Sequence, residues 1–114
     1  MNVKRKGSAG ERELARILRE YGYNARRGIQ TPNGQAEADV VGVPGLHIEV
    51  KRREDTKVFS ECMKQSVRDA KRLDDGTPVV AHRPNNEEWL ITLRLDDFMK
   101  IIGGQDTKHE LNND

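Results

Sequence analysis

The sequence of 114 residues has a single cysteine, Cys62, and only 4% of its residues are aromatic. One cysteine excludes an internal disulfide framework and a cysteine-rich zinc site, and it favours a reducing, cytoplasmic setting. No apolar run approaches the roughly 18 residues that a membrane-spanning helix needs, and no apolar segment follows the basic start of the chain as in a secretory signal. With so few aromatic side chains, the core is expected to be small and aliphatic.

Charge is abundant but nearly balanced, because 34% of the residues are charged and the formal net charge is only +1. Its distribution is uneven. Residues 1–30 hold eight Lys or Arg and three Glu, whereas residues 85–114 hold three basic and seven acidic residues. Such polarity can direct one face of a domain toward phosphate groups, although a solvated basic helix face gives the same pattern.

Hydrophobic periodicity predicts eight secondary-structure elements. Helices are expected over residues 8–21, 57–73 and 95–102, and strands over residues 24–29, 36–43, 46–52, 77–82 and 88–93. This order predicts an α/β fold with a mixed five-stranded sheet flanked by helices. The helix between the third and fourth strands requires a crossover, so these two strands should be parallel. Residues 1–102 are expected to form one domain and residues 103–114 a flexible polar tail.

The most informative segment comprises residues 39–51. Its last six residues, Leu-His-Ile-Glu-Val-Lys, alternate as in a half-buried strand, with an acid and an amine on the polar face. The turn at residues 42–45 is typical of a hairpin and returns Asp39 beside Glu49. Two carboxylates about 4 Å apart repel by roughly 4 kcal/mol at an effective dielectric near 20. A proton or a divalent cation between them relieves that repulsion, so the segment predicts a metal-assisted phosphodiesterase site.

In order and spacing, Asp39, Glu49 and Lys51, behind a helix that carries Glu11, resemble the PD-(D/E)XK nuclease superfamily. Residues 6–14, Lys-Gly-Ser-Ala-Gly-Glu-Arg-Glu-Leu, further resemble the opening of small Holliday junction resolvases. Similarity to phage-type resolvase-like endonucleases extends over residues 45–52, 78–83 and 89–93. The resemblance implies a restriction-endonuclease-like core of three layers.

The resemblance also implies a role for each of these side chains. Asp39 and Glu49 are expected to bind Mg²⁺ or Mn²⁺, with the carbonyl of Val50 as a further ligand and Glu11 as an outer ligand of the metal or its water. Lys51 is expected to neutralise charge on the attacked phosphate and to position or deprotonate the water. From the residues alone, Glu49 and Lys51 could be an exposed pair on an amphipathic strand, and Glu11 could close a capping box.

Three further polar residues bear on the site. Gln65 matches a site where relatives carry a catalytic-region Gln, although an exposed helical Gln is an equal alternative. His47 shares the strand face of the acid, but without a second His at ligand spacing it is not expected to bind metal. Relatives place a serine-bearing loop after the first strand, where this sequence offers only Thr31.

Basic residues that flank the site along the chain are expected to contact DNA phosphates without reading sequence. They are Lys4, Arg5, Lys6, Arg26, Arg27, Arg52 and Arg53. The resemblance therefore implies a metal-dependent endodeoxyribonuclease of branched DNA, of the Holliday junction resolvase kind. Two cuts require two sites, so a C2 homodimer is expected, in the cytoplasm of a bacterial or phage-infected cell. The alternatives are a flap, nicking or restriction-like nuclease of the same fold, a non-catalytic DNA-binding module, and a small interaction domain.

Overall fold

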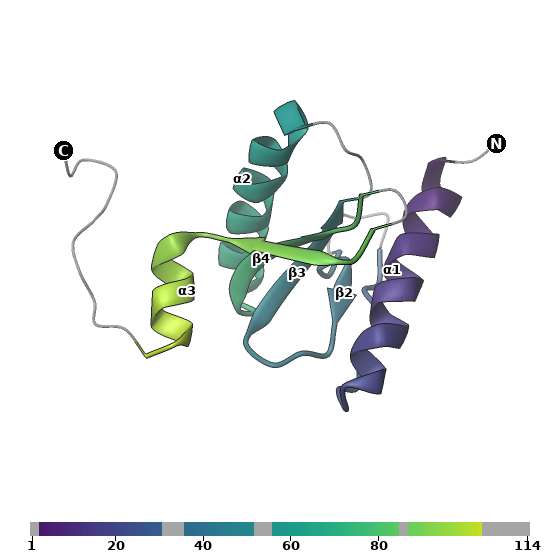
Figure 1. Cartoon of the computed structure of the whole chain (residues 1–114), viewed down its shortest axis with the longest axis horizontal. Helices are drawn as coiled ribbons and strands as arrows, with labels where there is room; N and C mark the ends of the chain where they lie inside the picture. Colours follow the sequence, from purple (N-terminus) through teal and green to yellow (C-terminus); the bar gives the residue numbers. More distant parts are fainter. Residues whose placement is uncertain (1–2, 31–35, 52–55, 85–86, 104–114) are drawn as a thin grey trace.

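The computed structural model describes residues 3–30, 36–51, 56–84 and 87–103, and for residues 3–8 and 56–59 it describes the backbone alone. The elements follow one another in the predicted order (Figure 1). They are α1 (Val3–Glu20), β1 (Arg26–Arg27), β2 (Val40–Val41), β3 (Leu46–Lys51), α2 (Thr56–Leu73), β4 (Thr77–His82), β5 (Leu90–Leu93) and α3 (Leu95–Ile101). Within these described residues, no helix is long and apolar enough to cross a membrane.

The five strands form one mixed sheet in the order β1-β2-β3-β4-β5. Neighbouring strands are antiparallel except β3 and β4, which run parallel over their full length. This parallel pair confirms the prediction made from the crossover, because α2 occupies the connection between the two strands. The predicted fold class, a mixed five-stranded sheet flanked by helices, is therefore confirmed.

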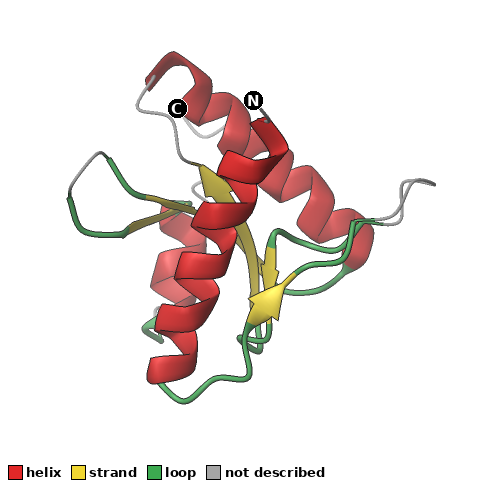
Figure 2. Cartoon of the chain, turned by 90° about the vertical axis from the view of Figure 1, so that its right-hand side faces the viewer, coloured by secondary structure: helices red, strands yellow, loops and turns green. Residues whose placement is uncertain are grey.

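Helices cover both faces of the sheet (Figure 2). On one face, Leu14 of α1 packs into an aliphatic cluster with Val40, Ile48 and Val79 from the three central strands. On the other face, α2 packs against β3 and β4. There the buried Ser66 hydroxyl donates to the carbonyl of Val79 over 3.1 Å. Because both faces are covered, the expectation of a half-buried third strand is wrong.

The element boundaries differ from the predicted ones mainly at the N-terminal side. Helix α1 begins at Val3, so Ser8 lies inside the helix and the predicted capping box is wrong. The helix ends before Gly22, whose φ of 100° favours glycine. Strands β1 and β2 have two residues each, yet backbone hydrogen bonds continue beyond them from Gly28 to Asp39 and from Glu37 to Ile29.

The C-terminal helix α3 has no buried residue and lies on the far side of the molecule from α1 (Figure 1). Apolar side chains gather in exposed positions on this helix and on the edge strand β5. They are Leu90 and Ile91 on β5, Leu95, Phe98, Met99 and Ile101 on α3, and Ile102 directly after α3. The predicted tail falls almost entirely on residues 104–114, which lie outside the described residues, so the domain boundary near residue 102 stays a prediction.

Candidate active site

Strand β3 presents His47, Glu49 and Lys51 toward α2, opposite the face that Ile48 contributes to the core. Their alternation follows from the two-residue period of a strand. This face of β3 is more buried than the sequence predicted, since His47 is 0% exposed and Lys51 only 7% exposed. Electrostatic interactions between neighbouring groups therefore act here at reduced screening by water.

The β2–β3 hairpin brings Asp39 opposite Glu49. Val40 pairs with Ile48 in this antiparallel ladder. Asp39, which precedes Val40, therefore lies opposite Glu49, which follows Ile48. In addition, the backbone N–H of Val50 donates to Oδ2 of Asp39 over 2.9 Å. Asp39 and Glu49 thus lie side by side, as the hairpin predicted, and the hydrogen bond from Val50 fixes Asp39.

Burial raises the pKa of Asp39 to about 8, and the negative charge of Glu49 acts in the same direction. The hydrogen bond from Val50 lowers the pKa, but a hydrogen bond with Glu49 and the charge of Glu11 raise it further. Burial and the neighbouring negative charges therefore favour the protonated form of Asp39 when no cation is bound. A divalent cation between the two acids would supply the positive charge that this proton supplies.

Glu11 reaches the site from the middle of α1. Its side chain is 16% exposed and accepts a hydrogen bond from Nε of Arg27 over 3.0 Å. Its negative charge acts on Asp39 and is the smallest of the influences that raise the pKa of that acid. The capping box is excluded, and the outer-ligand interpretation of Glu11 stays a prediction.

The ammonium group of Lys51 lies near two groups on adjoining elements. His82 of β4 is the residue that pairs with Lys51. Burial lowers the pKa of His82, and the positive charge of Lys51 lowers it further. On α2, burial raises the pKa of Cys62, the charge of Lys51 lowers it, and the charges of Glu49 and Asp39 raise it. Cys62 therefore faces the acids and the amine rather than a purely aliphatic core.

Gln65 lies exposed on α2, one turn after Cys62. Its predicted role stays a prediction, as does that of the Val50 carbonyl, since no contact described in the molecule tests either. Thr31 lies outside the described residues.

Two of the seven predicted DNA contacts have described side chains, and both are ion-paired. Arg26 binds both carboxylate oxygens of Glu37, at 2.9 and 3.2 Å, and Arg27 binds Glu11. Of Lys4, Arg5 and Lys6 only the helical backbone is described, and Arg52 and Arg53 lie outside the described residues. Phosphate binding by these seven residues stays a prediction.

Two acids near the site were missed in the sequence. Asp69 of α2 contributes a carboxylate oxygen that lies within 4.8 Å of ligand atoms of both His47 and Glu49. Asp75, in the turn after α2, binds Nδ1 of His47 over 2.9 Å. Asp69 follows Cys62 by seven residues on the inward stripe of its helix, which is a readable signal. Nothing in the sequence around Asp75 indicates its contact.

Comparison with known proteins gives the site a family context. No curated protein matches the chain. A solved structure of Hjc from Archaeoglobus fulgidus, a Holliday junction resolvase from an archaeal hyperthermophile, is 26% identical to the chain, with a TM-score of 0.55. The alignment covers 77% of this chain and 72% of that chain. The family model of archaeal Holliday junction resolvases (Hjc) matches residues 2–102, and the chain therefore belongs to this family.

Proposed function

We propose that the protein is a Mg²⁺- or Mn²⁺-dependent endodeoxyribonuclease that hydrolyses phosphodiester bonds in four-way DNA junctions. The observation that carries the proposal is the pair of adjoining carboxylates, Asp39 and Glu49, beside the buried Lys51 in a member of the resolvase family. Family membership supports the enzyme class, and the acids and the amine are the groups that metal-assisted hydrolysis needs.

The residues present fit a hard divalent cation. Asp39, Glu49 and Glu11 offer only oxygen atoms, which Mg²⁺ and Mn²⁺ prefer. The pKa of Asp39, about 8, reflects first its burial and then the charge of the adjoining Glu49, and a bound cation would offset both. Asp39 and Glu49 would hold the ion, with the Val50 carbonyl as a third ligand and Glu11 acting through a water molecule. When bound, the ion supplies charge against a phosphate oxygen and makes an attacking water more acidic.

The protein's own side chains then have separate tasks. Lys51 lies on the same strand face as Glu49, so its ammonium group can stabilise the negative charge that develops on the attacked phosphate. Its low exposure strengthens that effect. Glu11 is held by Arg27 and orients the water. By resemblance to the family, in-line attack would break the bond between phosphorus and the 3′-oxygen and leave a 5′-phosphate and a 3′-hydroxyl.

Substrate binding is assigned to the basic residues that flank the site along the chain, and Gln65 of α2 is kept among the proposed catalytic residues. Lys4, Arg5, Lys6, Arg26, Arg27, Arg52 and Arg53 would contact phosphates, which gives salt-dependent binding without sequence preference. In this arrangement Glu37 and Glu11 compete with phosphates for Arg26 and Arg27. The cytoplasm of a bacterial or phage-infected cell stays the predicted location.

A homodimer would provide the two cuts that resolution of a junction requires. The exposed apolar side chains of β5 and α3, defined above, form the surface that we assign to the dimer contact. Residues such as Phe98 and Ile101 would be buried by a symmetry-related copy, which stabilises association through the hydrophobic effect. Among the described residues, β5 is an edge strand of the sheet, and such an edge can pair with a second chain.

The alternatives keep the fold and change the activity. A flap, nicking or restriction-like nuclease would share the acids and the amine, and a non-catalytic module would bind DNA without cleaving it. The experiment is a cleavage assay in which four-way, flap and linear duplex DNA of equal length compete, in Mg²⁺, in Mn²⁺ and with a chelator. We expect metal-dependent cleavage of the four-way junction in preference to the other two.

The possible outcomes separate these functions. Preferential cleavage of flaps or linear duplex would replace the junction by another substrate while retaining the catalytic assignment. Binding of junctions without cleavage in either metal, together with no Mn²⁺ binding by calorimetry, would establish the non-catalytic module instead.

A further inference from the structure

His47 is wholly buried, yet both of its ring nitrogens contact carboxylates. Nε2 lies 2.7 Å from Oε2 of Glu49. Nδ1 lies 2.9 Å from each carboxylate oxygen of Asp75. The imidazole thus links an acid of the active site to an acid in the turn between α2 and β4. A buried polar group with both positions filled is held in one orientation.

The turn that carries Asp75 is pressed against the β2–β3 hairpin. Thr77 donates its backbone N–H to the carbonyl of Gly45 over 2.7 Å. A Cβ atom on Gly76, where φ is 137°, would lie 2.5 Å from the carbonyl carbon of Gly45, so only glycine permits this approach. The preceding Asp74 has a φ of 51°, in the left-handed region. The backbone is therefore arranged to place Asp75 against the base of β3.

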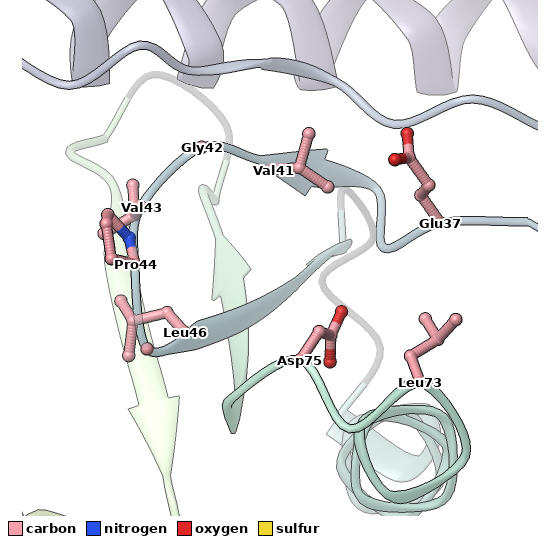
Figure 3. A pocket seen from close by; sticks show the side chains of 9 residues that line it. Glu37, Val41, Gly42, Val43, Pro44, Leu46, Leu73 and Asp75 are labelled. Carbon is pink, nitrogen blue, oxygen red and sulfur yellow. The ribbon is translucent and has the colours of Figure 1, made fainter.

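Asp75 also borders a cavity of about 400 Å³ beside the hairpin. Figure 3 shows its carboxylate there, below the hairpin turn, with Leu46 on the adjoining strand and Leu73 at the end of α2. The Asp75 side chain is 31% exposed, whereas that of Glu49 is 15% exposed. The chain of hydrogen bonds therefore runs from the partly exposed Asp75, through the buried imidazole of His47, to Glu49 in the candidate active site.

We propose that Asp75 and His47 are positioning residues that hold Glu49 in its metal-binding orientation. Nε2 of His47 fixes one carboxylate oxygen of Glu49 and leaves the other to share a cation with Asp39. Asp75 fixes the ring in turn. The inference rests on the proposed function, since it takes Glu49 as a metal ligand. It adds two residues that touch neither metal nor substrate.

Asp69 suggests a different arrangement, in which His47 is itself a metal ligand. Ligand atoms of His47, Glu49 and Asp69 lie within 4.8 Å of one another. However, Nε2 is at hydrogen-bonding distance from Glu49, and Nδ1 contacts both oxygens of Asp75. A cation on either nitrogen would displace one of these bonds. The positioning role keeps both.

Substitutions at Asp75 test the inference, with binding of Mn²⁺ to the whole protein measured by calorimetry. Asp75→Ala removes the acceptor for Nδ1 and should weaken Mn²⁺ binding about tenfold, as loss of an outer hydrogen-bond partner typically does. Asp75→Asn keeps a neutral acceptor, so it should restore most of the affinity and leave a loss of about threefold. The matched control is Asp74→Asn, in the same turn and exposed, which should bind Mn²⁺ like the wild type.

Two further measurements separate positioning from a general effect on folding. Junction binding in Ca²⁺ should be equal for all three variants. In a Glu49→Gln background, Asp75→Ala should cause no further loss of Mn²⁺ affinity, because its effect passes through Glu49. If Asp75→Ala does not fold, the comparison of Asp75→Asn with Asp74→Asn decides in its place.

Several results would overturn the inference. Equal Mn²⁺ affinity for Asp75→Asn and Asp74→Asn would remove the role of Asp75. A full tenfold loss from Asp75→Ala in the Glu49→Gln background would show that the residue does not act through Glu49. Loss of Mn²⁺ binding on Asp69→Asn, with Asp75→Ala unaffected, would establish His47 as a ligand instead. If the wild-type protein cleaves no branched DNA, the proposed function is overturned. That result needs no Asp75 variant, so it is distinct from failure of the inference about Asp75.

Discussion

Val50 donates its backbone N–H to Oδ2 of Asp39 across the β2–β3 hairpin, with 2.9 Å between the two atoms. Val50 lies between Glu49 and Lys51 on its strand, so this hydrogen bond anchors Asp39 at the centre of the candidate site. It also explains how a buried acid with a raised pKa is held in place when no cation is bound.

The substitution Asp39→Asn should abolish cleavage of four-way junctions while binding persists. The amide oxygen can still accept the Val50 hydrogen bond, but the side chain no longer offers a charge to a cation. Loss of metal assistance of about 4 kcal/mol corresponds to roughly a thousandfold slower single-turnover cleavage. Gel-shift binding in Ca²⁺ is the control, and cleavage at the wild-type rate would remove Asp39 from the site.

Replacing Lys51 by alanine should have the same effect on cleavage for a different reason. The substitution removes the ammonium group that neutralises the attacked phosphate, while Mn²⁺ binding by the acids should remain within a few fold of the wild type. Lys51→Met is the matched variant, because it retains most of the buried side-chain volume of a residue that is only 7% exposed. Cleavage by Lys51→Met at the wild-type rate would show that packing, and not charge, matters here.

Without metal, the protein should lose stability as the pH rises from about 4 to about 8. Asp39 has a pKa of about 8 when folded, against 3.8 for an ordinary Asp, so the folded state binds more protons than the unfolded state in this window. Asp39 alone should lower the free energy of unfolding by at most about 1.4 kcal/mol per pH unit. The measurement is urea unfolding in a chelator at several pH values.

Two comparisons test whether Asp39 causes this pH dependence of stability. Asp39→Asn should flatten the slope, although part of it should remain. Burial lowers the pKa of His47, but hydrogen bonds to Glu49 and Asp75 outweigh burial and leave it raised, which acts in the same direction. Added Mg²⁺ should restore stability above pH 7 in the wild type and not in Asp39→Asn. A slope that Asp39→Asn leaves unchanged would contradict the assignment.

A charge placed on the apolar surface of α3 should dissociate the proposed homodimer. Phe98→Glu, at a side chain that is 44% exposed, introduces an acid where the partner copy would bury an apolar ring. Light scattering should then give the monomer mass, and a cruciform plasmid should be nicked in one strand rather than linearised. Lys100→Ala on the same helix is the control and should remain dimeric. A monomeric wild type would contradict the assignment of this surface.

The Ser66 hydroxyl is expected to stabilise the packing of α2 on the sheet. Ser66→Ala removes its buried hydrogen bond to the Val79 carbonyl, which should cost about 1 kcal/mol in the free energy of unfolding. Ser60→Ala, at an exposed position of the same helix, gains the same helix propensity without losing a buried bond. The difference between the two variants in urea unfolding therefore isolates the hydrogen bond. A smaller loss for Ser66→Ala than for Ser60→Ala would contradict it.

The sheet was largely predictable because its pairing follows from local patterns. The turn at residues 42–45 specified an antiparallel hairpin, and the helix before β4 required a parallel pair. Family, fold class and the kind of enzyme were predicted correctly. The start of α1 was not, because Ser8 and Glu11 have the spacing of a capping box whether they begin a helix or lie inside one. Burial of Lys51 was also missed, since alternation indicates polarity and does not say which helix covers the polar face.

The arrangement of the site was predictable only in part. Asp39 and Glu49 are ten residues apart on one hairpin, so their proximity could be inferred from the turn. Asp75 meets His47 across 28 residues through the packing of two turns, and no sequence periodicity encodes such a contact. Arg27 was expected to face DNA, and its ion pair with Glu11 depends equally on tertiary packing.

The short connection between β2 and β3 also bears on the order of folding. Closing a loop of this length takes well under a microsecond, and a hairpin forms within about 10 microseconds, so Asp39 and Glu49 can meet early. Strand β4 joins only after the α2 crossover, whose longer loop has a larger entropic cost of closure. The acids should thus come together while still hydrated, and their mutual repulsion should grow only when α2 excludes water from above them.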